Sequence, residues 1–349
     1  MERMRFVYLL IAVAAILLFN PGIRAQETPS IREISPLVLT AQIPLPGVRG
    51  RFDHFTFDPA EPGRVFISAL GNNSVEVLNL VEGVEIHRIP GIPDPQGITF
   101  AVGLNKLFVG SRQGKLYIYD GTTYEPIKII DYNADVDNLR YDASSKRVYA
   151  GYGDGDTAAI GMIDATTNQR LDETYKTGAH PESYQLEKSG SNIYVNIPDL
   201  KQVGAIDRNT KKITKWPIPE GNDENFPMAL DEADHRLFIV TRTPPRLMVF
   251  DTNAGKVVAA LPCVGDVDDL YYDANHKRVY IPGGQGFIDV FQQKDPDHYE
   301  LIAKVPTVIG ARTAGYAAKL GKKGQDRFFL AVPIAPGREA SVWLYTVQE

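Results

Sequence analysis

Short apolar segments recur along the chain from about residue 37 to its end, and polar turns separate them. Most of these segments are short and rich in Val, Ile, Phe and Tyr, which favour pleated sheets. Gly, Pro, Asn and Asp, which are typical of tight turns, lie at their ends. The pattern predicts an all-β protein built from many short strands.

The strands follow an internal repeat. The segment Ala134–Asp142 recurs as Gly265–Asp273, and each copy is followed by a near-identical segment that ends in Lys-Arg-Val-Tyr. The two copies lie 131 residues apart, which is three steps of a shorter period. Weaker copies place seven units along the chain, with starts near Arg51, Asp94, Asp135, His180, Asp223, Asp266 and Ala311.

Each unit contains four short strands, and the unit starts lie 41 to 45 residues apart, which is typical of a β-propeller blade. The last unit stops after its third strand, Ser341–Val347, whereas the apolar segment Leu37–Leu45 precedes the first unit. We expect Leu37–Leu45 to become the outer strand of the last blade, because this pairing removes an exposed edge. The sequence therefore predicts one seven-bladed β-propeller with four-stranded antiparallel blades over residues 26–349. Two separate β domains are the alternative, and they would leave Leu37–Leu45 without a partner.

The units also share a motif, in which an Arg-Val-Tyr strand is followed by an apolar residue, an Asp and a Thr-containing turn. The residues that carry it include Arg147–Tyr149, Ile163–Thr167, Phe250–Asn253 and Val257–Val258. This motif resembles the YVTN or YncE-like repeat of exported bacterial seven-bladed propellers. The resemblance covers all seven units and implies the fold, but such a motif marks architecture rather than chemistry.

The N-terminal segment has the pattern of a secretory signal. Arg3 and Arg5 precede an apolar run from Phe6 to Phe19, and the small residue Ala25 follows shortly afterwards. The run is shorter than the roughly 18 residues that a membrane span needs. We expect residues 1–25 to be a cleaved signal peptide and the mature chain to be periplasmic or secreted in a bacterium, without a stable membrane span. A retained anchor is the alternative.

Charge and cysteine content exclude several functions. The formal net charge of −6 argues against strong binding to nucleic acid. Cys263 is the single cysteine, which excludes an intramolecular disulfide, a CxxCH haem attachment and a cysteine-cluster zinc site. We expect a monomer that is stabilised by a large core.

Candidate site residues follow from the blade geometry. In a propeller the first strand of each blade lines the central channel. The loops that enter this strand share one face of the ring, which we call the channel-mouth face, with the loops between the second and third strands. The predicted binding residues are His54, Gln96, Asp137, Glu182, Asn225, Asp268 and Arg312 from the entry loops, with Arg112 and Arg242 from the second set of loops.

Several of these residues are carboxylates, which are costly to hold together unless a cation or protons neutralise them. The candidate metal ligands are Asp137, Glu182, Asp268 and His54. The carboxylates favour a divalent ion such as Ca²⁺, whereas the histidine favours a transition metal. The alternative is that the aspartates only cap turns, which suits Asp135 and Asp266 best.

These observations lead to one functional hypothesis and two alternatives. The first is an exported, non-enzymatic binding or scaffold protein whose channel-mouth face takes a small ligand, a peptide or a protein partner. It follows from seven similar blades without a Gly-x-Ser-x-Gly elbow or another catalytic constellation, so catalytic residues stay unassigned. The alternatives are a metal-assisted lactonase-like hydrolase and an accessory subunit of a periplasmic redox enzyme that takes its cofactor from a partner.

Overall fold

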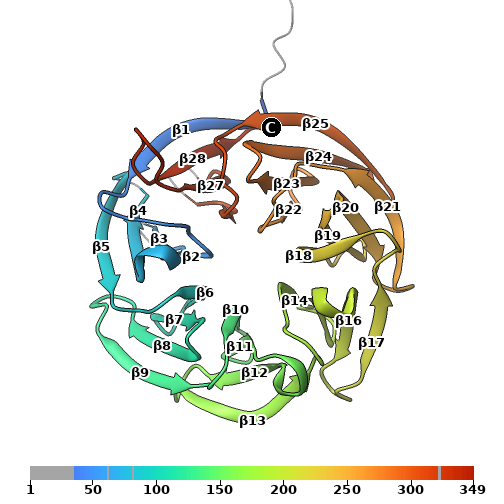
Figure 1. Ribbon diagram of the computed structural model, residues 1–349, viewed down its shortest axis with the longest axis horizontal. Coiled ribbons are helices and arrows are strands. Elements are labelled where there is room, and N and C mark those ends of the chain that lie inside the picture. Colours follow the sequence, from blue (N-terminus) through green and yellow to red (C-terminus); the bar gives the residue numbers. More distant parts are fainter. Residues whose placement is uncertain (1–34, 61–62, 81, 321–323) are drawn as a thin grey trace, which may run out of the picture. The chain divides into compact units, whose positions relative to one another are not determined.

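A computed structural model describes residues 35–60, 63–80, 82–320 and 324–349. The predicted signal peptide, residues 1–25, lies outside these ranges. The described residues form seven four-stranded antiparallel sheets, which are arranged as blades around a central channel (Figure 1). The seven-bladed β-propeller that the repeat predicts is confirmed.

The strands of each blade follow one another in chain order from the channel outwards. Blade 1 contains β2 (Phe55–Asp58), β3 (Arg64–Ala69), β4 (Ser74–Asn79) and β5 (Val84–Pro90), and blade 2 contains β6 (Pro95–Ala101), β7 (Lys106–Ser111), β8 (Lys115–Asp120) and β9 (Pro126–Asp131). Blade 3 contains β10 (Val136–Asp142), β11 (Arg147–Tyr152), β12 (Ala159–Asp164) and β13 (Gln169–Lys176), and blade 4 contains β14 (Tyr184–Leu186), β15 (Asn192–Ile197), β16 (Gln202–Asp207) and β17 (Ile213–Pro217). Blade 5 contains β18 (Asp223–Asp231), β19 (Arg236–Thr243), β20 (Pro245–Asp251) and β21 (Lys256–Pro262), and blade 6 contains β22 (Tyr271–Asp273), β23 (Arg278–Gly283), β24 (Phe287–Asp295) and β25 (His298–Pro306). Blade 7 contains β26 (Ala314–Ala317), β27 (Arg327–Val332), β28 (Ser341–Val347) and β1 (Leu37–Pro44).

Three short 3₁₀ helices occur among the described residues, and each lies in a loop between the second and third strands of a blade. They are η1 (Leu70–Asn72), η2 (Gly155–Thr157) and η3 (Pro198–Leu200). In the part of the chain that the structure describes, no helix has the length and apolarity needed to cross a membrane.

The last blade is completed by the strand that comes first in the chain. β1 pairs antiparallel with β28, in a register that runs from Leu37 opposite Val347 to Pro44 opposite Ser341. In Figure 1 the blue β1 lies beside the red β28. Ile43 of β1 is fully buried in the same hydrophobic cluster as residues of blades 1 and 7. The ring is therefore closed by hydrogen bonds between strands from the two ends of the propeller.

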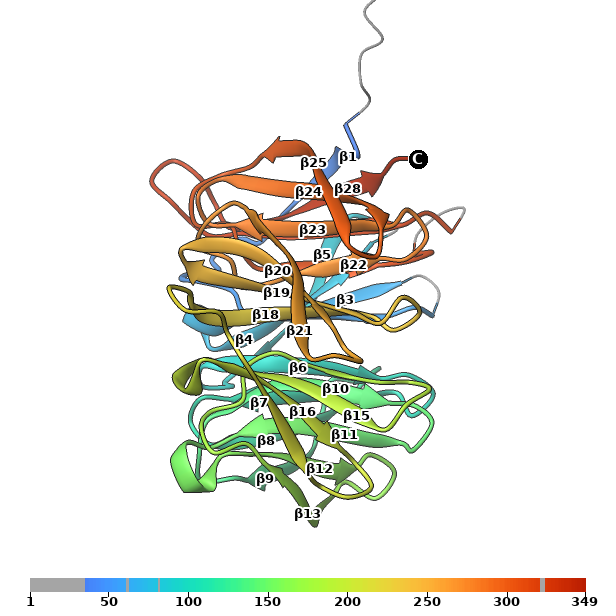
Figure 2. The same cartoon turned by 90° about the vertical axis from the view of Figure 1, so that its right-hand side faces the viewer.

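The hydrophobic core lies between adjacent blades rather than at the centre of the ring. Phe66 of blade 1, for example, stacks on Phe100 of blade 2 with ring centroids 5.3 Å apart, and the other clusters likewise join neighbouring blades. The strands run between two faces of the ring, and turns lie at both faces (Figure 2). Because the core lies between the blades, polar side chains can line the channel.

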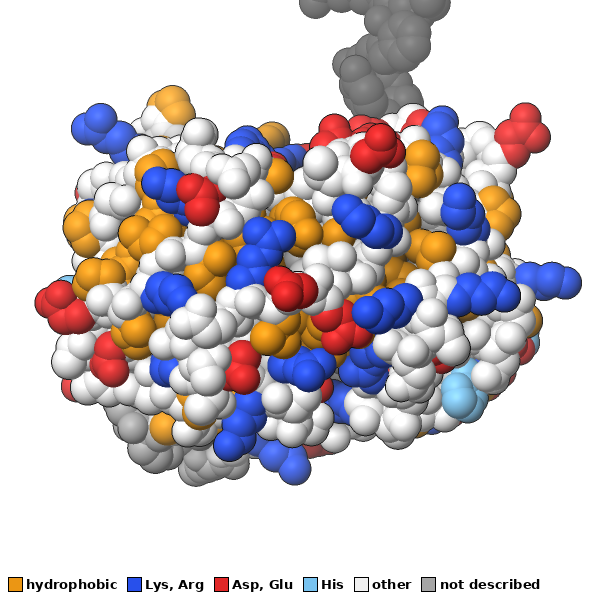
Figure 3. All heavy atoms as spheres, turned by 90° about the horizontal axis from the view of Figure 1, so that it is seen from below, with side chains coloured by type: hydrophobic (Ala, Val, Ile, Leu, Met, Phe, Trp, Pro, Cys, Tyr) orange, Lys and Arg blue, Asp and Glu red, His pale blue; other side chains and the backbone are white. Residues whose placement is uncertain are grey.

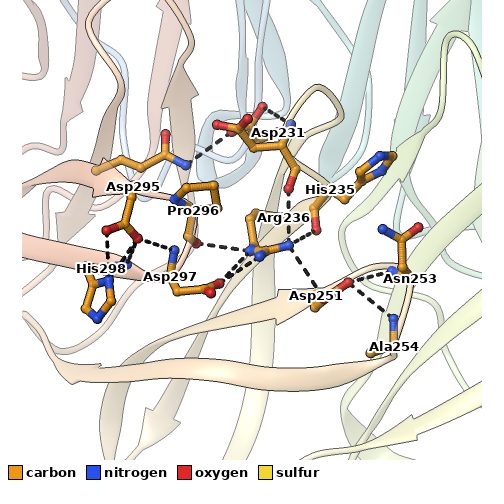
Figure 4. Close-up of polar contacts among 12 residues, drawn as sticks. Asp231, His235, Arg236, Asp251, Asn253, Ala254, Asp295, Pro296, Asp297 and His298 are labelled. Carbon is orange, nitrogen blue, oxygen red and sulfur yellow. Dashed lines mark hydrogen bonds and ion pairs between the residues drawn. The ribbon is translucent and has the colours of Figure 1, made fainter.

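Polar contacts at the face opposite the channel mouth also tie neighbouring blades together. Arg236 begins the second strand of blade 5, and its guanidinium donates to the Pro296 carbonyl and to Asp297 in the outer turn of blade 6 (Figure 4). Arg64 and Lys106 begin the second strands of blades 1 and 2, and they contact the outer turns of blades 2 and 3 in the same way. In blades 1, 2 and 5 the basic residue that begins the second strand therefore joins one blade to the next.

The outer surface carries charges of both signs. On the side of the ring that Figure 3 shows, lysine and arginine side chains are interspersed with aspartates and glutamates around smaller hydrophobic areas. This side therefore does not present a surface of one sign.

Closure of the ring can be tested on β1 itself. We expect Ile43→Ala to lower the free energy of unfolding by about 2–4 kcal/mol, because it leaves a cavity in a well-packed core. Leu39→Ala on the same strand is the control, since Leu39 is 39% exposed and its truncation should cost less than about 1 kcal/mol. Urea denaturation measures both values. If both substitutions lowered the free energy of unfolding by the same small amount, closure through β1 would be contradicted.

Candidate functional site

The channel-mouth face contains a cavity of about 230 Å³ that is lined by residues from all seven blades. Eight of the predicted binding residues line it: His54, Gln96, Asp137, Glu182, Asp268, Arg312, Arg112 and Arg242. Arg51, Asp53, Asp135 and His180 line it as well. The cavity thus brings together acidic, basic and imidazole groups that are far apart in the sequence.

The structure places Asn225 outside this lining. Its side chain is fully buried, and Nδ2 donates to Oδ1 of Asn196 at 2.8 Å. The register of β18 shifts between Asn225 and Met228, and the next residue, Phe226, lines the cavity instead. The ring of Phe226 lies 4.2 Å from the guanidinium carbon of Arg242, close enough for a cation–π contact.

A β-bulge aims Asp137 at the channel. The register of β10 shifts between Asp137 and Leu139, and Asn138 adopts a left-handed conformation with φ of 41°. The Tyr184 hydroxyl donates to the Asn138 carbonyl at 2.9 Å and holds the bulge in place. The Asn138 backbone N–H donates to Oδ1 of Asp137 at 2.6 Å. Bulges of this kind re-aim side chains at functional sites.

His54 lies among carboxylates from three blades. Its Nε2 is 3.3 Å from Oδ1 of Asp137 in blade 3, and its Nδ1 is 3.8 Å from Oδ1 of Asp269 in blade 6. Asp53, His54 and Asp137 each offer one ligand atom, and these atoms lie within 4.8 Å of one another. Hydrogen bonds to Ser68 at the end of β3 fix the backbone of both Asp53 and His54. The three side chains form a group that could hold a metal ion.

This group differs from the predicted ligand set. It contains His54 and Asp137, but among the described residues its third member is Asp53 rather than Glu182 or Asp268. Asp53 directly precedes His54, at the position in its unit that Asp137 has in the third unit, so the repeat alignment carried a signal for it. The expected convergence of Asp137, Glu182 and Asp268 on one ion is therefore corrected.

Asp268 is not part of this group, and its carboxylate is paired with arginines instead. It forms ion pairs with Arg242 and with Arg312. Arg242 also donates from Nε to the Val267 carbonyl at 2.9 Å. Guanidinium groups neutralise a carboxylate strongly in such contacts, so Asp268 is already compensated without a cation.

Asp135 and Asp266, which we expected to cap turns, also face arginines. Asp266 forms an ion pair with Arg312, and Oδ2 of Asp135 lies 3.8 Å from Nε of Arg112. Both carboxylates therefore belong to the charge arrangement of the channel mouth.

Burial raises the proton affinity of several carboxylates in the cavity. Burial, with the nearby charge of Asp137, raises the pKa of Asp53 to about 6, that of Asp135 to about 6 and that of Glu182 to about 7. At neutral pH Glu182 is therefore only partly ionised, whereas Asp53 and Asp135 are mostly ionised and take up a proton as the pH falls to about 6.

His54 and Asp137 form an ion pair instead. Burial disfavours the charged form of His54, but contact with Asp137 and the charges of Asp53 and Asp269 outweigh burial and raise its pKa to about 9. Burial likewise opposes ionisation of Asp137, but His54 and the Asn138 N–H outweigh it and lower the pKa of Asp137 to about 2.

Four oxygen atoms of cavity-lining residues are buried with neither a hydrogen-bond partner nor an ion pair. They are Oδ2 of Asp53, Oε1 of Gln96, Oδ1 of Asp135 and Oδ1 of Asn138. A buried polar atom without a partner costs about 1–3 kcal/mol. These atoms therefore mark positions where a bound group would gain hydrogen bonds or coordination.

The fold and this site define the chain as a seven-bladed β-propeller with a charged, polar cavity at one mouth of its channel. No family model matches the chain. Over 155 residues it is 22% identical to the uncharacterized protein YncE of Salmonella typhi and 21% identical to YncE of Salmonella typhimurium. The match covers 44% of this chain and 44% of each relative, so the chain spans less than half the length of the curated relatives it matches. The YncE-like resemblance seen in the repeat is confirmed.

Two solved structures share the fold. A chain of the mitotic checkpoint complex superposes with a TM-score of 0.74 at 13% identity, covering 96% of this chain and 99% of that one. A chain of Kuenenia stuttgartiensis hydrazine synthase superposes with a TM-score of 0.70 at 16% identity, covering 85% and 97%. At these identities the likeness shows the fold alone.

The raised pKa of Glu182 predicts a pH-dependent loss of stability. Its folded value of about 7 lies above the ordinary 4.5, so the native state binds the extra proton between these values. Stability therefore falls as the pH rises through this window. Glu182→Gln stays neutral, so between pH 4.5 and 8 the wild type should lose about 1–3 kcal/mol relative to the variant. Urea denaturation across this pH range measures the difference.

The control is Glu300→Gln, which removes an exposed carboxylate from β25. Its stability should follow the wild-type pH profile. A Glu182→Gln profile that runs parallel to the wild type would show that Glu182 is not a buried acid.

Proposed function

We propose that this chain is an exported, non-enzymatic binding protein, and that its channel-mouth cavity holds a small polar ligand or the end of a peptide. The observation that carries the proposal is the convergence of polar side chains from all seven blades on one cavity, with four buried acceptors that lack partners. A closed ring places these groups rigidly, which favours binding because little order is lost on association.

The charges of the cavity indicate what such a ligand carries. Asp53, Asp137 and Glu182 from blades 1, 3 and 4 favour ammonium or hydroxyl donors, whereas Arg51 and Arg112 favour a carboxylate. The volume of about 230 Å³ lies below the usual range for drug-sized ligands. A compact zwitterion or a peptide terminus therefore fits the cavity best.

The geometry favours binding over the hydrolase alternative. A metal-assisted lactonase was expected to use Asp137, Glu182 and Asp268 as ligands of one ion, but Asp268 forms ion pairs with two arginines. The mitotic checkpoint complex chain shows that a propeller of this shape serves in a protein assembly, which supports a binding or scaffold role here.

A thermal-shift experiment tests the binding proposal. Purified protein in EDTA-containing buffer is mixed with glutamate, putrescine, gluconate or triglycine, each at millimolar concentration. We expect the zwitterionic probes to raise the melting temperature of the wild type, because a ligand that binds only the folded state stabilises it. Arg112→Ala should abolish the shift, since it removes a carboxylate partner from the cavity.

Lys294→Ala is the matched control, because Lys294 is an exposed cation near the end of β24, away from the mouth. This variant should respond to the probes as the wild type does. Shifts that are equal in all three proteins, or absent with every probe, would overturn the proposed role of the cavity.

We also propose export through cleavage after Ala25, on the basis of Arg3, Arg5 and the apolar run that follows them. Expression of the full chain in a bacterium should yield a periplasmic or secreted product that begins at Gln26. Intact-mass spectrometry of the fractions measures this directly. A membrane-bound product with an intact N-terminus would show a retained anchor instead.

A further inference from the structure

We propose that Asp53, His54 and Asp137 bind one divalent transition-metal ion beside the channel-mouth cavity. The inference builds on the proposed role of the mouth as a binding site and names a specific occupant for part of it. The three side chains come from blades 1 and 3, and their ligand atoms lie within 4.8 Å of one another.

The spacing of the ligand atoms suits coordination. Nε2 of His54 and Oδ1 of Asp137 are 3.3 Å apart. Two ligands bound to one tetrahedral ion at about 2.0–2.2 Å are separated by roughly 3.3–3.6 Å. The two atoms are therefore already at the distance that a shared ion requires, and a carboxylate oxygen of Asp53 lies within 4.8 Å of both.

Unpartnered buried atoms point to a bound ion independently of this spacing. Asp53 is 8% exposed and Gln96 is 3% exposed, and both line the cavity. Oδ2 of Asp53 and Oε1 of Gln96 have no hydrogen-bond partner. Gln96 belongs to blade 2, which lies between the blades that supply Asp53 and Asp137. Gln96 therefore brings an unpartnered oxygen to the same cavity as the cluster.

Groups around the cluster orient the ligands. Asp269 approaches the other ring nitrogen of His54, with Oδ1 at 3.8 Å from Nδ1. Metal-bound histidines typically have such a carboxylate on their second nitrogen, which fixes the ring and increases its basicity. The Asn138 N–H that donates to Asp137 holds this carboxylate as well. The arrangement therefore has both ligands and supporting contacts.

The donor set selects the type of metal. Ca²⁺ prefers six to eight oxygen ligands, but Asp268 is held by arginines and Glu182 lies outside the group. An imidazole nitrogen with two carboxylates suits Zn²⁺, Mn²⁺ or Fe²⁺ instead. Three protein ligands also leave coordination positions open towards the cavity.

A second cluster of the same residue types provides an internal comparison. Asp273, His276 and Asp326 also lie within 4.8 Å of one another. Their carboxylate oxygens have partners, however, since His276 Nδ1 lies 2.7 Å from Asp273 Oδ2, and Asp326 accepts from the Tyr316 hydroxyl at 2.8 Å. In the first cluster, by contrast, Oδ2 of Asp53 has none. The second cluster is satisfied as a hydrogen-bond network, so we expect it to bind metal weakly or not at all.

Calorimetric titration tests the site. Protein stripped with EDTA and then dialysed is titrated with ZnCl₂, and Co²⁺ serves as an absorption probe of the ligands. We expect one equivalent of Zn²⁺ to bind. His54→Gln and Asp53→Asn should each weaken binding at least tenfold and alter the Co²⁺ spectrum. His276→Gln and Glu300→Gln should leave affinity and stoichiometry unchanged, because both residues lie away from the channel mouth, and circular dichroism confirms that every variant is folded.

Each other outcome overturns the assignment. Loss of Zn²⁺ binding in His276→Gln but not in His54→Gln would place the metal in the second cluster. Tighter binding of CaCl₂ than of ZnCl₂, with loss in Glu182→Gln and Asp268→Asn, would indicate an oxygen site across the mouth. If the wild type binds no Zn²⁺, the metal site is ruled out. The proposed ligand-binding function is not, because the ligand screen is carried out in EDTA.

Discussion

Pairing of β1 with β28 is the interaction on which the rest of this molecule depends. Seven blades can face one channel only if the ring closes, and here the strand from the start of the propeller completes the last blade. Ile43 and Leu45 then fill the core between blades 7 and 1. Closure brings Asp53 and Arg312, which lie at opposite ends of the sequence, to the same cavity.

The position of the core explains why many charged side chains can line the central channel. Apolar side chains are buried between blades, so the channel wall is left to polar residues. Buried charges are costly unless they are paired, and most here are: Asp137 with His54, and Asp268 with two arginines. Buried oxygens of Asp53, Gln96, Asp135 and Asn138 lack partners, and the proposed ligand would supply them.

Likeness to known proteins locates the fold but not the chemistry. The similarity to YncE covers less than half of either chain, and the two solved structures share the architecture at 13% and 16% identity. Loops at one face of a propeller can change while the blades are kept. The function must therefore be argued from the side chains at the channel mouth.

The sequence by itself determined the blades, their number and the face on which polar residues gather, because alternation and turn residues are local properties that a repeat copies into every unit. His54, Asp137 and Arg312 could be assigned to the mouth for this reason. Only the tertiary structure decided which side chains meet. A bulge in β18 directs Asn225 away from the cavity. Asp268 forms ion pairs with arginines, and Asp53 lies beside His54 in the group that could hold a metal ion. Contacts across the channel depend on bulges and side-chain directions in different blades, and no single unit of the repeat encodes the distance between two others.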